Sequence, residues 1–312
     1  MTCLDNTIAL RMYATGARAQ ATNYRRESES SVGCRRRCHL VPKSCLLLAS
    51  LCVLTLSQYG CEGPGGVKEY QPRTGPDDAY TKLKRLIEHA QPVRLGELPE
   101  QFCDAHGIEY VLIRPGKFMM GATKPFGVRR EVSIDRPFYL GKYELTRRQW
   151  CSVMLPSAKD RVDSPEYPQV NITRKGAADF CRELSKTNGL SGRLPTEEEW
   201  EFCCKAGSGA KYCFGNGDAK LSEYAWTQDN SGRRLHPVGG KRPNRWMLYD
   251  MHGNAAEWCE NGAEHGGDAV GSIGCGCERG IEDLILTPDE SNPWTGFRVA
   301  VELPMSVAGR SN

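Results

Sequence analysis

The densest group of side chains suited to chemistry lies in residues 248–259. Here Asp250 and Glu257 flank the dipeptide Gly253-Asn254, and such dipeptides favour tight turns with positive φ. A turn that brings two carboxylates and backbone carbonyls together suits a hard cation such as Ca²⁺. A purely structural turn is the alternative, because glycine–asparagine pairs form turns in many proteins.

A second candidate group is the pair Cys275 and Cys277, separated by one glycine in a chain with 15 cysteines. Two thiolates this close can chelate one soft metal ion, of which Cu(I) is an example. They can also act as a redox couple, although a disulfide across one residue is strained. The third interpretation is that both are incidental in a cysteine-rich chain. The sequence contains no phosphate loop and no Rossmann fingerprint.

Residues 247–258 resemble the hallmark Gly-Leu-Tyr-Asp-Met-x-Gly-Asn-Val-x-Glu-Trp of the sulfatase-modifying-factor family, with Met247 in place of the usual glycine. Four other segments resemble the family's remaining signatures, and all five follow the family order over roughly residues 105 to 302: 118–121, 142–146, 192–201 and 296–299. The family includes the formylglycine-generating enzyme. The resemblance implies an α+β, decorated C-type-lectin-like fold that is rich in loops.

The resemblance also implies a structural calcium site. Its ligands would be the side chains of Asp250 and Glu257 and the backbone carbonyls of Gly253 and Ala255, and such an all-oxygen set suits Ca²⁺. A second calcium site of the family is not expected, because a ligand asparagine falls at Trp226.

The resemblance implies the activity of the formylglycine-generating enzyme, which oxidises a cysteine in a sulfatase Cys-x-Pro-x-Arg motif by means of two cysteines that bind Cu(I) and use O₂. In this chain the second of those cysteines aligns with Cys275, but the first aligns with Val270. The candidate catalytic residues are therefore Cys275 and Cys277, an incomplete pair. Two functions stay open: a copper-dependent oxidoreductase acting on a protein or peptide such as a sulfatase, and a non-catalytic lectin-like binding module.

Composition narrows the function classes. The chain has 312 residues and a net charge of only +3, without a sustained basic stripe, so nucleic-acid binding is not expected. The 33 glycines and 18 prolines favour a loop-rich fold over a helical bundle.

The N-terminal region reads as an export signal. Residues 1–61 combine a disordered start with a lipoprotein signal peptide: a basic segment at 35–37, an apolar run at 45–56, and Gly60-Cys61, which resembles the end of a bacterial lipobox. We expect a membrane-anchored lipoprotein tethered at Cys61. Ordinary secretion, giving a periplasmic or secreted protein, and an uncleaved anchor are the alternatives. Residues 62–104 then form a linker with a short helix, 105–303 the family domain and 304–312 a tail.

The hydrophobic pattern predicts the elements that position these groups. Strands are expected at 110–113 and 118–120, paired as a β-hairpin, and at 138–144. Helices are expected from Thr146 to Met154, over 173–186, and after Thr196, where a capping box marks the start. His252 is interpreted as an exposed turn residue.

Overall fold

The computed structural model describes residues 76–88, 94–121, 129–270, 276–277 and 290–304. All of them belong to one compact unit, Gly65–Asn312. The predicted signal segment, the tether residue Cys61 and the candidate Cys275 lie outside the described residues, and so does most of the predicted tail. Among the described helices, none combines the length and the apolar character that a membrane span requires.

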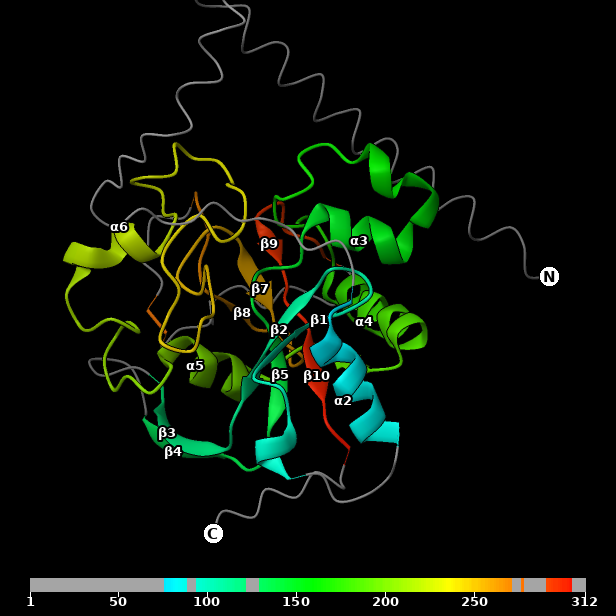
Figure 1. Cartoon of the computed structure of the whole chain (residues 1–312). Coiled ribbons are helices and arrows are strands. Elements are labelled where there is room, and N and C mark those ends of the chain that lie inside the picture. Colours follow the sequence, from blue (N-terminus) through cyan, green and yellow to red (C-terminus); the bar gives the residue numbers. More distant parts are fainter. Residues whose placement is uncertain (1–75, 89–93, 122–128, 271–275, 278–289, 305–312) are drawn as a thin grey trace, which may run out of the picture. The chain divides into compact units, whose positions relative to one another are not determined.

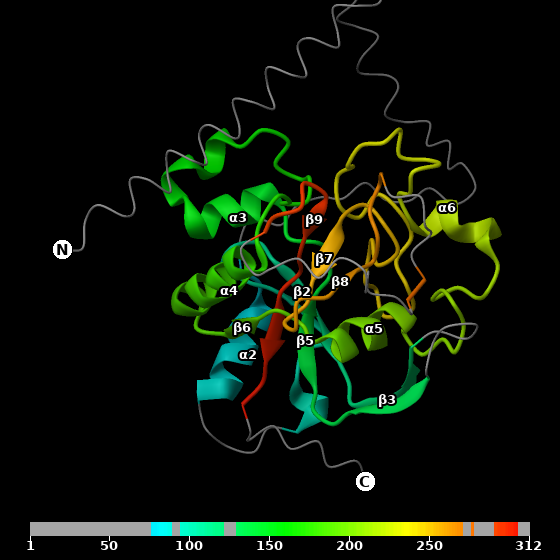
Figure 2. The same cartoon turned by 180° about the vertical axis from the view of Figure 1, so that it is seen from behind.

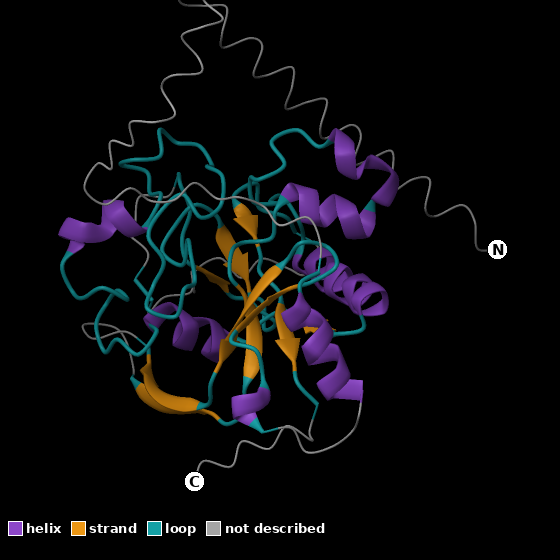
Figure 3. Ribbon diagram, viewed as in Figure 1, coloured by secondary structure: helices purple, strands orange, loops and turns teal. Residues whose placement is uncertain are grey.

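The centre of the unit is a five-stranded antiparallel sheet (Figures 1 and 3). Its order is β1 (Gln101–Cys103), β2 (Glu109–Ile113), β5 (Phe138–Gly141), β10 (Ala300–Glu302) and β6 (Ser191–Arg193). Two smaller sheets accompany it. One pairs β3 (Gly116–Met120) with β4 (Arg130–Ile134), and the other has the order β8 (Glu264–His265), β7 (Ala256–Trp258) and β9 (Thr295–Gly296).

Both faces of the central sheet are covered. Along β2, Tyr110 and Leu112 pack into one hydrophobic core, and Val111 and Ile113 pack into another, as the alternation of side chains along a strand requires. The first core includes residues of α2 (Asp78–Glu88), α3 (Arg147–Met154) and α4 (Arg174–Asn188), and the second includes residues of β3, β4 and α5 (Glu197–Lys205). The two opposite views show the two groups of elements on opposite sides of the sheet (Figures 1 and 2).

Helices α3, α4 and α5 begin where the sequence predicts. Thr146, Thr173 and Thr196 each accept a backbone N–H in the first turn of α3, α4 and α5, and the first and third form capping boxes with Gln149 and Glu199. The remaining helical segments are short: η1 (Leu95–Glu97), η2 (Pro156–Arg161), η3 (Asp218–Lys220) and α6 (Leu221–Tyr224).

The predicted hairpin between strands 110–113 and 118–120 is wrong. Strand β2 pairs with β1 and β5, whereas β3 pairs with β4. Every residue of β2 is buried, so this strand takes an inner place in the central sheet, but β3 alternates between exposed and covered positions and suits a peripheral ribbon. Because β1 also joins the sheet, regular structure begins upstream of residue 105.

The segment between α5 and β7 contains little regular structure, and polar side chains order it instead. The Asn244 side chain accepts the N–H groups of Trp246 and Leu248 at 2.9 and 3.2 Å, and it donates to the carbonyl of Cys203 at 2.7 Å. These bonds replace the ladders that a sheet would provide. They tie the loop that carries Asp250 to helix α5.

Candidate functional site

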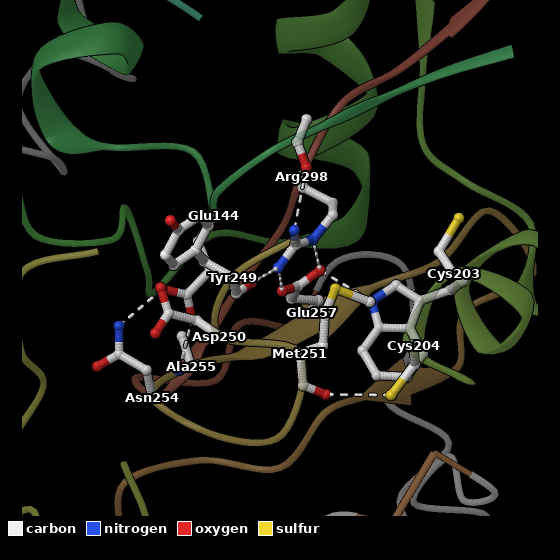
Figure 4. A network of polar contacts seen from close by, with 12 residues as sticks. Glu144, Cys203, Cys204, Tyr249, Asp250, Met251, Asn254, Ala255, Glu257 and Arg298 are labelled. Carbon is white, nitrogen blue, oxygen red and sulfur yellow. Dashed lines mark hydrogen bonds and ion pairs between the residues drawn. The ribbon is translucent and has the colours of Figure 1, made fainter. Parts of the chain in front are cut away.

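A buried ion pair joins strand β7 to the segment between β9 and β10 (Figure 4). The Arg298 guanidinium donates to both carboxylate oxygens of Glu257, from Nε at 2.6 Å and from Nη2 at 2.5 Å. Trp200 of α5 donates its Nε1–H to the same carboxylate at 2.8 Å. Arg298 also donates to the carbonyls of Gly141 and Tyr249, each at 3.0 Å. One side chain thus joins β5, β7 and the loop that precedes β7.

Two more carboxylates lie beside this pair. The Glu144 carboxylate accepts the Ala255 backbone N–H and the Asn254 side-chain amide, each at 2.7 Å. Asp250 Oδ2 accepts the Gly239 N–H at 2.6 Å. Asp250 Oδ1 is buried and has no hydrogen-bond partner among the described residues. An unpartnered buried carboxylate oxygen is costly, so this atom marks a place for a ligand.

In the cluster formed by Glu144, Asp250, Glu257 and Arg298, negative side chains outnumber positive ones. Arg298 faces three buried carboxylates, those of Glu144, Asp250 and Glu257. Burial raises the pKa of Asp250 to about 6, and the Glu257 charge contributes in the same direction. Burial and the neighbouring Asp250 charge raise the pKa of Glu144 well above its usual range. A bound cation would relieve this excess of negative charge.

The residues present fit a hard cation at Asp250 in part. Its free Oδ1 and the local negative charge suit Ca²⁺. Glu257 already accepts three hydrogen bonds, from Arg298 and Trp200, which leaves about one of a carboxylate's four acceptor positions. Gly253 holds the turn against the Trp226 backbone, because an added Cβ would lie 2.2 Å from that carbonyl oxygen. Calcium binding by Asp250, Gly253, Ala255 and Glu257 stays a prediction.

The family's two-thiolate copper site does not fit the described residues. Val270, at the position of the first cysteine, has no metal-binding atom in its side chain. Cys277 is described and is completely buried, so a peptide in solvent has no access to its thiol. The role of Cys275 stays a prediction.

The structure gives Cys277 different neighbours. The ligand atoms of Cys204, His252 and Cys277 all lie within 4.8 Å of one another, and all three residues are buried. Cys204 Sγ lies 3.7 Å from Nδ1 of His252. The members of this group are 48 and 25 residues apart along the chain, so no local sequence motif indicates it. The available signal was the position of Cys204 one helical turn after Trp200, on the same side of α5.

The interpretation of His252 as an exposed turn residue is wrong, because the residue is 1% exposed. Its ring meets the rings of Tyr212 and Phe214 edge-on, with centroids 5.4 and 5.7 Å away. The backbone N–H of Cys213 donates to Nε2 at 3.3 Å. The loop 208–216 thus covers a turn that the local sequence makes look exposed.

A surface cleft of about 510 Å³ lies along α4 and β6. Four cationic side chains and one acidic side chain contribute to its lining: Arg174, Lys175, Arg182, Arg193 and Glu260. The charge of Arg193 is matched by Glu199, which binds it through two oxygens at 2.6 and 2.7 Å. The excess of positive charge suits an anionic ligand segment.

Several known proteins are similar in sequence to this chain. A protein called Chaperone protein LppX from Paenibacillus barcinonensis is 27% identical over 201 residues, covering 48% of this chain and 70% of that protein. The formylglycine-generating enzyme of Bos taurus is 32% identical over 106 residues, covering 30% of this chain and 27% of that enzyme. The inactive Cα-formylglycine-generating enzyme 2 of Bos taurus is also 32% identical, over 103 residues, covering 30% of this chain and 32% of that protein. The chain therefore spans about a third or less of the two bovine proteins.

The fold has a solved counterpart in PvdO from Pseudomonas aeruginosa, with a TM-score of 0.56 and 23% identity over 65% of this chain and 98% of that one. This likeness confirms the predicted fold class. The family model for the sulfatase-modifying factor enzyme 1-like domain matches residues 96–303. Because this match covers two thirds of the chain, the chain belongs to the sulfatase-modifying-factor family.

Proposed function

We propose that this protein is a binding module of its family that does not generate formylglycine. The observation that carries the proposal is the burial of Cys277. An enzyme that oxidises a cysteine of a peptide must present its own thiols to that peptide. Here the described candidate thiol lies inside the second hydrophobic core, and a valine stands where the resemblance expects its catalytic partner.

The partner that the surface favours is a protein segment rich in carboxylates. The cleft along α4 and β6 is lined by more basic than acidic side chains. Lys175 and Arg182 lie on α4, and Arg182 forms an exposed ion pair with Asp179. Exposed ion pairs contribute little to stability, so this guanidinium can change partners at small cost when an acidic segment arrives.

Calcium would have a structural role in such a module. Asp250 and Glu257 would hold it with the carbonyls of Gly253 and Ala255, and its charge would offset the excess carboxylates around Arg298. The support for this is the unpartnered Oδ1 of Asp250. Lipid anchoring at Cys61 would keep the module at a membrane surface outside the cytoplasm.

Two assays test the proposal. In the first, the full chain is incubated with Cu(I), O₂ and a peptide containing Cys-x-Pro-x-Arg, and the peptide mass is followed, with bovine formylglycine-generating enzyme as the positive control. We expect no conversion by this protein. Conversion that is lost in a Cys275→Ser variant would refute the proposal and establish an enzyme.

The second assay measures binding of a glutamate-rich labelled peptide by fluorescence anisotropy. Reversing two charges, with Lys175→Glu and Arg182→Glu together, should weaken binding by about tenfold or more, because opposed charges across an interface become like charges. Arg114→Glu and Lys117→Glu together are the matched control, since both side chains are exposed and neither lines the cleft. Equal effects of the two changes would exclude the cleft as the binding surface.

A further inference from the structure

The group formed by Cys204, His252 and Cys277 lies outside the calcium prediction and outside the family's copper positions. Its three members come from helix α5, from the turn before β7 and from the segment that contains residues 276–277. Their ligand atoms lie within 4.8 Å of one another, and the three side chains are completely or almost completely buried. Two sulfurs and one imidazole nitrogen this close surround a space that one metal ion can occupy with small side-chain movements.

We propose that Cys204, His252 and Cys277 bind a structural zinc ion. The donor set consists of soft sulfur and borderline nitrogen atoms, which select zinc or copper over calcium or magnesium. The site is buried, and burial penalises any net charge. Two thiolates and a neutral imidazole carry a charge of −2, which Zn²⁺ cancels completely and Cu⁺ cancels only in part. Charge balance therefore favours zinc.

Cys213, in the loop 208–216 that covers His252, is a candidate for the fourth zinc ligand. The backbone N–H of Cys213 donates to His252. The thiol of Cys213 lies close enough to Cys277 for Cys277 to contribute to the raised pKa of Cys213, after burial. A water molecule is the other candidate, because zinc sites are usually four-coordinate. The proposal rests on the three residues that meet and does not require Cys213.

Proton balance follows from the contacts in the structure. Burial raises the pKa of the Cys204 thiol well above its ordinary value, and the neighbouring Cys277 raises it further. Without metal, Cys204 is a thiol and donates to the Met251 carbonyl at 3.4 Å. Binding Zn²⁺ forms two zinc–sulfur bonds and releases two thiol protons to solvent. Zinc occupancy should therefore fall in acid.

The imidazole must also change its tautomer. In the structure, Nε2 accepts the Cys213 N–H at 3.3 Å, so the proton of the neutral ring lies on Nδ1, toward Cys204. A zinc ion bound at Nδ1 would replace that proton, and the ring proton would move to Nε2. The amide of Cys213 would then lose its acceptor, so zinc binding should shift the loop 208–216.

The test measures zinc in the purified full chain and in matched variants, by mass spectrometry of the metal. The wild type should hold about one zinc ion per chain, and Cys204→Ala and Cys277→Ala should each hold almost none. Cys203→Ala is the control and should keep the metal. Cys203 is the neighbour of Cys204 on α5 and equally buried, but its sulfur points in another direction (Figure 4).

Two measurements on the wild type keep the proposal testable when the variants do not fold. Cobalt(II) substituted for zinc should produce a sulfur-to-metal charge-transfer band, which sites made of oxygen ligands alone lack. Alkylation mapped by mass spectrometry should label Cys204 and Cys277 several-fold faster after a zinc chelator is added. Folded wild type without zinc, a disulfide between Cys204 and Cys277, copper in place of zinc, or equal zinc loss in Cys203→Ala would each overturn the proposal.

Discussion

Replacing Asp250 with asparagine removes one of the three buried carboxylate charges that face Arg298. Asparagine keeps an oxygen that can accept the Gly239 N–H, and it tolerates the left-handed φ of 58° that residue 250 adopts. The substitution therefore removes a charge with little change of shape. In calcium-free buffer at pH 7, we expect Asp250→Asn to be more stable than the wild type.

The size of this stability difference follows from the raised pKa of Asp250. Burial raises the pKa of Asp250 from 3.8 to about 6 in the folded chain. Each pKa unit corresponds to about 1.4 kcal/mol, so the ionised side chain costs about 3 kcal/mol of folding free energy at pH 7. Because the folded-state pKa is the higher one, the folded chain binds more protons between these values, and the cost grows as pH rises from about 4 to about 6. The advantage of the variant should therefore shrink as pH falls from about 6 to about 4 and be absent below that range.

Calcium should reverse the sign of this effect. An ion bound to the carboxylate stabilises the ionised form, so wild type should gain stability with added Ca²⁺ and the variant should gain little. The assay is urea unfolding of both proteins at pH 7 and pH 4.5, with a chelator or with millimolar Ca²⁺. If Asp250→Asn is less stable than wild type in the chelator by an amount that does not depend on pH, the reasoning about this buried charge is wrong.

Three other substitutions test the network by urea unfolding. Arg298→Met should destabilise the chain by about 3–5 kcal/mol, because it leaves Glu257 buried without its partner. Thr196→Ala should cost about 1 kcal/mol through loss of the capping box, and a loss below a few tenths would contradict that role. Gly253→Ala should cost about 1–3 kcal/mol or more, because the added Cβ would overlap the backbone carbonyl oxygen of Trp226. Gly209→Ala is the control, because a Cβ added there has no neighbouring atom within 4 Å.

Local patterns predicted the helices of this protein well. Thr146, Thr173 and Thr196 are caps in the structure because capping depends on neighbours three residues away. Strand pairing was less predictable, since β2 pairs with β1 and β5 and not with the next strand along the chain, and its inner place reflects burial on both faces. The same limit applies to His252, which looks exposed within its own turn and is covered by a loop some 40 residues away.

Four of the five family signatures of this chain meet at the buried ion pair of Glu257 and Arg298. Glu144, Trp200, Glu257 and Arg298 come from four different signatures, and all four lie in or beside the buried ion pair. Arg298 alone bonds to three separate segments of the chain. Removing one partner of a buried ion pair costs about 3–5 kcal/mol, so a single replacement of Glu257 or Arg298 weakens the fold strongly.

The resemblance places the catalytic thiols of the formylglycine-generating enzyme at other positions, 270 and 275. Val270 donates its N–H to Asp268, outside the ion pair, so a valine at this position of the enzyme pattern leaves every contact of Arg298 in place. The signatures that establish membership are therefore evidence for a fold and a rigid centre. They carry no evidence for oxidation of a sulfatase, and activity in this family must be argued from the thiols alone.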